Sequence, residues 1–274
     1  MCQIKLSQTE APEKECTGFL VRENNIRRKK DGFMKIEVDT HSHTLASGHA
    51  YNTIREMASA AAEKGLRGLA ITDHAIEMPG TCHSYYFENL RIVPRQMYGI
   101  ELLMGTELNI LNEDGEVDMP HRLLGEMDIA IASLHSPCYK GEHTMEAVGR
   151  AYMNVMENEY VDIIGHPDDG RFPVDFEMLA REARRTGTLL EVNNSSLRPG
   201  GFRLNAMENS KKMLAECKKQ GTMIVLGTDS HVDVDIAEYP YAFRVLEETD
   251  FPEELVANTS LEKLKSSLKH NKNI

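Results

Sequence analysis

From Met34 onward, short apolar runs alternate with segments of helical periodicity, and this alternation limits the chain to few folds. Helical spacing is clear over residues 54–61, 174–186 and 205–219, and each segment is soon followed by a glycine that suits a helix end. The seven strands that we expect span residues 35–40, 67–73, 101–107, 128–134, 161–165, 187–193 and 222–228. Near-continuous apolar strands separated by amphipathic helices indicate a parallel sheet covered by helices.

Almost every expected strand ends in a polar residue. Barrels gather their active sites at the carboxyl ends of the strands, whereas an open doubly wound sheet concentrates them at a switch point. We therefore expect an α/β fold, a distorted (β/α)7 TIM-like barrel, with the open sheet as the alternative. No glycine-rich dinucleotide or phosphate-binding loop joins a strand to a helix, which argues against nicotinamide and nucleoside-triphosphate chemistry.

Three histidines, His41, His43 and His49, lie within nine residues at the end of the first expected strand. Alternate side chains of an extended chain share a face, so His41 and His43 can direct two ring nitrogens at one point. That arrangement suits a metal ion, although two such histidines can also simply form hydrogen bonds.

The other strand ends strengthen the metal interpretation. Imidazoles or carboxylates follow the remaining apolar runs at His74, Glu107, His135, His166, Asp229 and His231. If these ends share one rim, the fold brings together seven histidines, one glutamate and one aspartate. Imidazole nitrogens and carboxylate oxygens suit zinc, and also manganese or iron.

With these motifs the sequence resembles the PHP (polymerase and histidinol phosphatase) superfamily, most closely its YcdX-type bacterial metal-dependent phosphatases. The matching pieces are Asp39-Thr-His41-Ser-His43-Thr with His49, Thr72-Asp73-His74, Gly105-Thr-Glu107-Leu-Asn109, Ser133-Leu-His135, Gly165-His166-Pro167, Glu191-Val-Asn-Asn-Ser-Ser196 and Gly227-Thr-Asp229-Ser-His231. They extend over about residues 35 to 260. The resemblance implies a distorted seven-stranded barrel with three divalent metal ions, usually zinc, at the strand ends.

The resemblance also implies how the metals would be shared. The first ion would take His41, His43, Glu107 and Asp229; the second His135 and His166, with Glu107 bridging; and the third His49, His74 and His231. From their positions beside the ligands, Asp39 and Asp73 are candidates to fix imidazole tautomers, or they form ordinary hydrogen bonds at strand ends.

The expected reaction is hydrolysis of a small-molecule phosphomonoester by a metal-activated hydroxide, without a protein nucleophile. The candidates for binding the substrate are Arg91, Arg95, His83, Asn194, Arg198 and Arg203. Each of the charged candidates can equally be a surface charge, and Asn193 and Asn194 can instead cap a loop. The physiological substrate and the oligomeric state are not specified by the sequence.

Two alternatives remain open: a phosphodiesterase or nuclease of the same superfamily, and a non-catalytic metal-binding barrel. The net charge of −12 argues against nucleic-acid binding, which relies on clustered Lys and Arg. No apolar run approaches the roughly 20 residues of a membrane span. The five cysteines form no Cys-x-x-Cys pair, so we expect free thiols and a cytoplasmic location.

Residues 1–33 differ from the rest of the chain, with seven basic against five acidic residues and no steady periodicity. We interpret them as an N-terminal extension, either disordered or a start site placed too early. Residues 34–274 would form the PHP-type barrel domain.

Overall fold

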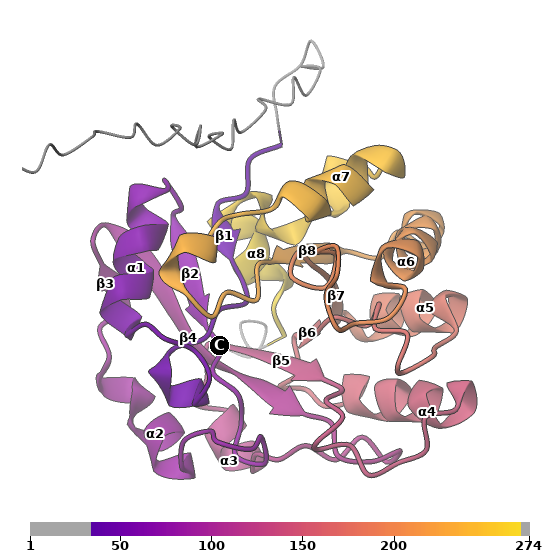
Figure 1. Ribbon diagram of the computed structural model, residues 1–274, viewed down its shortest axis with the longest axis horizontal. Helices are drawn as coiled ribbons and strands as arrows, with labels where there is room; N and C mark the ends of the chain where they lie inside the picture. The colour runs from indigo at the N-terminus through magenta and orange to yellow at the C-terminus, as the bar shows by residue number, and fades with distance from the viewer. Residues whose placement is uncertain (1–33, 270–274) are drawn as a thin grey trace, which may run out of the picture. The chain divides into compact units, whose positions relative to one another are not determined.

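A computed structural model describes residues 34–269 of the chain. The predicted N-terminal extension over residues 1–33 lies outside the described residues. Seven parallel strands follow one another in the order β1-β2-β4-β5-β6-β7-β8, and helices surround them (Figure 1). The strands are β1 Val38–Asp39, β2 Gly68–Ile71, β4 Ile100–Asn109, β5 Ile129–Ser133, β6 Ile163–Ile164, β7 Leu189–Asn193 and β8 Ile224–Gly227.

The connections between the strands carry the helices. The α-helices of the described residues are α1 Ile54–Glu63, α2 Ser84–Asn89, α3 His121–Leu124, α4 Met145–Met156, α5 Phe176–Thr186, α6 Ala206–Gln220, α7 Pro240–Glu248 and α8 Leu261–Ser267. Short 3₁₀ helices lie at η1 Leu45–Ser47, η2 Leu90–Ile92, η3 Asp233–Asp235, η4 Glu253–Leu255 and η5 Ala257–Thr259. None of the helices within residues 34–269 is both long and apolar enough to cross a bilayer.

The first and last strands meet at a seam that nearly closes the sheet into a barrel. An isolated parallel bridge joins Ser42 and Ser230, just beyond the carboxyl ends of β1 and β8. Closer to the amino-terminal end, the Asn258 amide donates to the carbonyls of Val38 at 2.9 Å and Leu226 at 2.8 Å. A side chain thus substitutes for part of the strand ladder at this seam. The predicted distorted (β/α)7 barrel is confirmed, and the open sheet is wrong.

The apolar core has two parts. A larger part lies between the strands and the surrounding helices and includes Leu69, Leu102 and Leu190. A smaller part combines residues from every parallel strand with two leucines of α8 and the leucine directly after it: Val38, Ala70, Leu103, Ile129, Ile131, Ile163, Leu189, Val225, Leu261, Leu264 and Leu268. Because successive strand residues point to opposite faces, the inward row of β4 continues to Glu107 and that of β7 to Glu191.

Most predicted elements agree with the structure, and the differences concern short strands. Gly187 and Gly221 end α5 and α6 in the left-handed region, with φ values of 73° and 70°, as expected. The chain also contains an unpredicted strand, β3 Gln96–Met97, which pairs antiparallel with the start of β4. β1 and β6 are only two residues long, shorter than predicted.

Candidate metal centre

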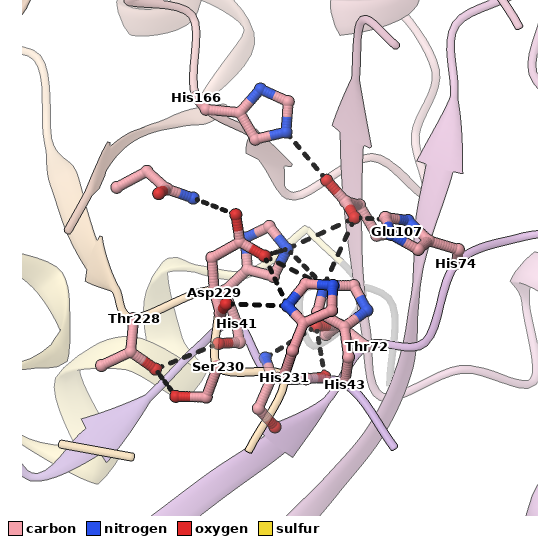
Figure 2. Close-up of polar contacts among 12 residues, drawn as sticks. His41, His43, Thr72, His74, Glu107, His166, Thr228, Asp229, Ser230 and His231 are labelled. Atoms are coloured by element: carbon pink, nitrogen blue, oxygen red, sulfur yellow. Dashed lines mark hydrogen bonds and ion pairs between the residues drawn. The ribbon is translucent and has the colours of Figure 1, made fainter. Parts of the chain in front are cut away.

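One buried carboxylate lies at the centre of the candidate site. Glu107, near the carboxyl end of β4, is 1% exposed and has imidazole nitrogens around both of its oxygens (Figure 2). Its Oε2 lies 3.4 Å from His41 Nε2, 3.5 Å from His43 Nε2 and 2.7 Å from His74 Nδ1. Its Oε1 lies 3.2 Å from His135 Nε2 and 3.0 Å from His166 Nε2. Five rings from four different strand ends therefore meet at one side chain.

Two of these rings come from the segment after β1, where they flank Ser42. His41 Nδ1 lies 2.7 Å from Glu191 Oε1, and a carboxylate can only accept, so this nitrogen carries the proton. His43 Nδ1 lies 3.0 Å from the Ser47 hydroxyl, which donates its own proton to Asp73 at 2.7 Å. In the neutral form both rings therefore present an unprotonated Nε2 to the centre.

Two further rings are oriented in the same way, by a hydrogen-bond acceptor at Nδ1. His135 Nδ1 donates to Asn109 Oδ1 at 2.7 Å, and the Asn109 amide in turn donates to Asp118 at 2.6 Å. His231 Nδ1 donates to the backbone carbonyl of Asp229 at 3.0 Å. In each case an acceptor behind the ring leaves Nε2 available as a ligand, as is usual for histidines that hold metals.

Asp229 supplies a second carboxylate to the centre. Its backbone is in the left-handed region at φ 56°, which is uncommon for a residue other than glycine. One oxygen, Oδ1, lies 3.2 Å from His43 Nε2. The other, Oδ2, accepts from Arg203 at 3.1 Å and from Asn193 at 3.2 Å. The Arg203 guanidinium thus fixes the side of the carboxylate that faces away from the histidines.

His49 lies at the outer side of the cluster, in the loop after η1. Its ring centroid is 4.9 Å from that of His74 and 4.9 Å from that of His231. The structure thus brings all nine predicted ligand residues into one cluster.

The positions of several of these atoms suit coordination of a metal ion better than direct hydrogen bonds with one another. His74 Nδ1 and Glu107 Oε2 are buried and only 2.7 Å apart, yet neither forms a hydrogen bond of acceptable geometry. His41 Nε2 and His43 Nε2 lie 3.1 Å apart although both rings already donate through Nδ1. Only a proton or a cation between such lone pairs makes this arrangement favourable. Within residues 34–269, three groups of side chains have ligand atoms that all lie within 4.8 Å of one another. They are His43, His74 and His231; His41, His43 and Glu107; and His74, Glu107 and His135.

The electrostatics of the cluster are strongly perturbed. Burial would raise the pKa of Glu107, but the neighbouring imidazoles, His135 first, hold it well below its usual value. Burial lowers the pKa of His43 well below the ordinary value, and lowers that of His135 to about 4. Burial also opposes protonation of His41, but the carboxylates around it, Glu191 first, raise its pKa well above the usual value. Strong shifts of this kind are typical of functional sites.

The predicted substrate-binding residues have different locations. Arg203 is nearly buried against Asp229, and Arg198 is exposed nearby in the same β7–α6 loop, 3.5 Å from Asp235. Asn194 accepts from the backbone amides of Tyr241 and Ala242 at the start of α7, so it caps that helix.

The remaining candidates come from the segment between β2 and β4. His83 is exposed and caps α2 by accepting from the amide of Tyr85 at 3.2 Å. Arg91 is exposed on η2. Arg95 forms an ion pair with Asp128 at 2.6 Å, beside the amino-terminal ends of β4 and β5. The prediction that Arg95 binds the substrate is wrong, because the chain returns to the opposite end of the barrel before β4 begins.

The two carboxylates predicted to fix imidazole tautomers, Asp39 and Asp73, do not contact ring nitrogens directly. Asp39 accepts from the side chain and amide of Thr228, at 2.6 Å and 3.1 Å, and from the amide of Ala237 at 3.1 Å, so it supports the seam and not a ring. Asp73 reaches His43 only through Ser47. The carboxylate that does accept from a ring Nδ1 is Glu191, on His41, and the sequence assigned it no role. Its inward place on β7, two residues before Asn193, was the available signal.

A nearly closed parallel barrel with histidines and carboxylates converging at its carboxyl rim defines a class of metal-dependent hydrolases. Comparison with known proteins specifies the family. The PHP domain model matches residues 39–197, and the chain belongs to this family.

Proteins of similar sequence align with most of the chain. A protein of Acetivibrio thermocellus named "probable phosphatase" is 44% identical over 239 residues, covering 87% of this chain and 98% of its own. A "probable phosphatase" of Caldanaerobacter subterraneus subsp. tengcongensis is 41% identical, covering 86% and 92%. The crystal structure of histidinol phosphate phosphatase from Lactococcus lactis subsp. lactis, complexed with zinc, L-histidinol and phosphate, has a similar fold. It superposes with a TM-score of 0.53 at 18% identity, covering 79% of this chain and 94% of that one.

Proposed function

We propose that this protein hydrolyses phosphomonoesters of small molecules at a centre of three divalent metal ions. It is a metal-dependent phosphatase, in keeping with its family and with relatives that it matches along nearly their whole length. The observation that carries the finer proposal is the Glu107 carboxylate, whose two oxygens face two different sets of ring nitrogens. A carboxylate placed in this way suits a bridge between two ions.

The proposed ligand sets follow the arrangement of the side chains. The first ion would lie among His41, His43, Glu107 and Asp229; the second among Glu107, His135 and His166; and the third among His49, His74 and His231. His43 also lies close to His74 and His231. We assign it to the first ion because its Nε2 is 3.1 Å from His41 Nε2 and 3.2 Å from Asp229 Oδ1.

When bound, divalent ions in such a centre lower the pKa of a coordinated water and neutralise charge on the phosphoryl oxygens. The protein side chains prepare the site for this role. Asn109, Glu191 and Ser47 accept from ring Nδ1 atoms and keep the opposite nitrogens free. Zinc is the first candidate because the donors are imidazoles and carboxylates, and manganese or iron also suit them.

For the substrate, we propose that Arg198 meets the phosphate or the leaving group at the rim. A guanidinium fork matches phosphate oxygens, and this side chain is 54% exposed and, within residues 34–269, has only a long contact to Asp235. Arg203 is already engaged by Asp229, so we propose that it acts by orienting that carboxylate. The Lactococcus lactis neighbour is complexed with zinc, L-histidinol and phosphate, and a small phosphorylated molecule is the partner that we propose here.

We also propose a reducing, cytoplasmic environment. Cys82, Cys138 and Cys217, the cysteines within residues 34–269, are all unpaired. Cys138 is buried and its sulfur faces the carbonyl of Glu77, which suits packing better than metal binding.

The test is a comparison of ester classes with zinc- and manganese-loaded protein. We expect p-nitrophenyl phosphate to be cleaved at least about tenfold more efficiently than bis-p-nitrophenyl phosphate, and single-stranded oligonucleotides to remain intact. Removal of the metals with a chelator should abolish hydrolysis, and adding them back should restore it. Diester cleavage that exceeds monoester cleavage would instead favour a nuclease of the same family.

A further inference from the structure

We propose that Glu191 is a positioning residue that couples the first and second metal sites by holding His41 and His166 at the same time. This inference rests on the proposed trinuclear centre. The two histidines belong to different proposed ligand sets and lie far apart in the sequence, on the segments after β1 and β6. Glu191 is fully buried beneath them on β7.

The two oxygens of Glu191 have separate partners. Oε1 lies 2.7 Å from Nδ1 of the His41 ring, and Oε2 accepts the backbone amide of His166 at 2.8 Å. The first contact sets the tautomer of a ligand, and the second sets the backbone from which another ligand projects. One carboxylate therefore controls the geometry of both.

The contact with His166 matters because this residue has an unusual backbone. Its φ is 32°, in a region that residues other than glycine seldom adopt, and such conformations persist only where surrounding contacts enforce them. The ring that projects from this backbone lies with Nε2 3.0 Å from Glu107 Oε1. Losing the Glu191 acceptor would free the backbone to relax and would move that nitrogen.

The surroundings of Glu191 leave it little freedom. A methyl group on Gly227 would lie 2.0 Å from Glu191 Oε1, so only a glycine on β8 leaves room for the carboxylate. Asn193 donates to Glu191 Oε2 at 3.1 Å and to Asp229 Oδ2 at 3.2 Å. The network thus extends from Glu191 to the second carboxylate of the first site.

The substitution Glu191→Gln tests this role with almost no change of shape. A glutamine offers one acceptor oxygen and one NH₂ group, whereas the site presents donors from His41, His166 and Asn193. In either orientation the NH₂ group faces a donor. Either His41 must move its proton to Nε2 and cease to be a ligand, or the His166 amide loses its acceptor.

A matched control is Asp162→Asn. Asp162 is also a fully buried carboxylate, and it accepts the backbone amides of Ala130 at 3.0 Å and Lys269 at 2.6 Å. It immediately precedes β6, at the opposite end of the barrel from the proposed centre. Its loss should reduce stability without changing the affinity of folded protein for metal.

The measurement is zinc binding to each full-length variant, by competition with a fluorescent chelator and by elemental analysis after gel filtration. For E191Q we expect at least one of the first and second ions to bind about ten- to a hundredfold more weakly than in the wild type, with the third unchanged. If the first ion weakens, ¹⁵N spectra should show His41 shifted toward the Nε2–H tautomer, a change that general destabilisation would not produce. D162N should bind zinc like the wild type.

The proposal is overturned if E191Q binds all ions like the wild type, if it weakens the third ion, or if D162N weakens the first or second ion to the same extent. Should E191Q not fold, Glu191→Asp serves instead, because the shorter carboxylate cannot reach both partners. The affinity for at least one of the first two ions should then fall about tenfold. Wild-type affinity for both would refute the coupling. A wild-type protein that binds no zinc would overturn the proposed function as well. A wild-type protein with bound zinc and monoesterase activity, alongside an unaffected E191Q, would overturn only this inference.

Discussion

The amino-terminal half of the barrel interior is filled by aliphatic side chains of the strands and by three leucines in and directly after α8, whereas the carboxyl-terminal half holds carboxylates and imidazoles at the ends of the same strands. On β4 the inward row passes from Leu103 to Glu107, and on β7 from Leu189 to Glu191. The apolar half gains free energy from burial, while the polar half carries the cost of desolvating charged groups. One half of the interior thus supports the fold, and the other half is available for function.

The largest effect should follow from Glu107→Gln, which removes the central carboxylate from the polar half. Phosphatase activity should fall by more than about a hundredfold, because even residues that merely orient ligands cost ten- to a hundredfold. Steady-state kinetics with p-nitrophenyl phosphate provides the measurement. Glu101→Gln is the control, since Glu101 lies at the start of the same strand and pairs with Lys265. Equal losses in both variants would show that the two halves do not differ in the way described.

Leu264→Ala probes the apolar half. This fully buried leucine of α8 lies in the inner core, and its truncation should lower the free energy of unfolding by about 2 to 5 kcal/mol. Urea unfolding of the metal-free protein measures the cost. At a temperature where the variant is folded, zinc content and kcat should match the wild type; a loss of zinc without a loss of stability would contradict the division of roles.

The polar half should also make stability depend on pH. Burial raises the pKa of Asp168, in the loop after β6, from an ordinary value of 3.8 to about 6. The folded state therefore binds this proton more tightly than the unfolded state, and the stability of the metal-free protein falls as pH rises through that window, by at most about 3 kcal/mol. In Asp168→Asn the difference in unfolding free energy between pH 4 and pH 7 should shrink by that amount. An unchanged difference would show that Asp168 is not the group responsible.

The smallest effect is expected at the rim. Arg198→Ala should raise the KM for phosphomonoesters severalfold and leave the unfolding free energy nearly unchanged, because an exposed ion pair contributes only about 0 to 1 kcal/mol. Lys211→Ala, on the outer face of α6, is a control in which a surface charge is lost away from the strand ends. A similar rise in KM in both variants would remove Arg198 from substrate binding.

The sequence predicted the barrel and the ligand cluster because both depend on local patterns. Apolar runs ending in histidine or carboxylate determine strands and rim together, and parallel strands bring all their carboxyl ends to one edge. The positions of His135 and His166 near Glu107 follow from this rule without knowledge of any loop.

The remaining features depend on contacts between distant segments. Asn194 was predicted to contact the substrate, but its side-chain oxygen accepts from the amides of Tyr241 and Ala242, and this contact depends on where α7 begins. The role of Glu191 depends on the ring of His41, 150 residues away. The wrong prediction for Arg95 could have been avoided from the sequence. Arg95 lies a few residues before an expected strand, which places it at the amino-terminal end of the barrel.

We propose that three divalent ions lie among these side chains, two of them bridged by Glu107. Anomalous diffraction at the zinc absorption edge, from crystals of zinc-loaded protein, tests it directly. We expect three peaks, two of which share Glu107 as a ligand. A single peak, or peaks remote from Glu107, would contradict it.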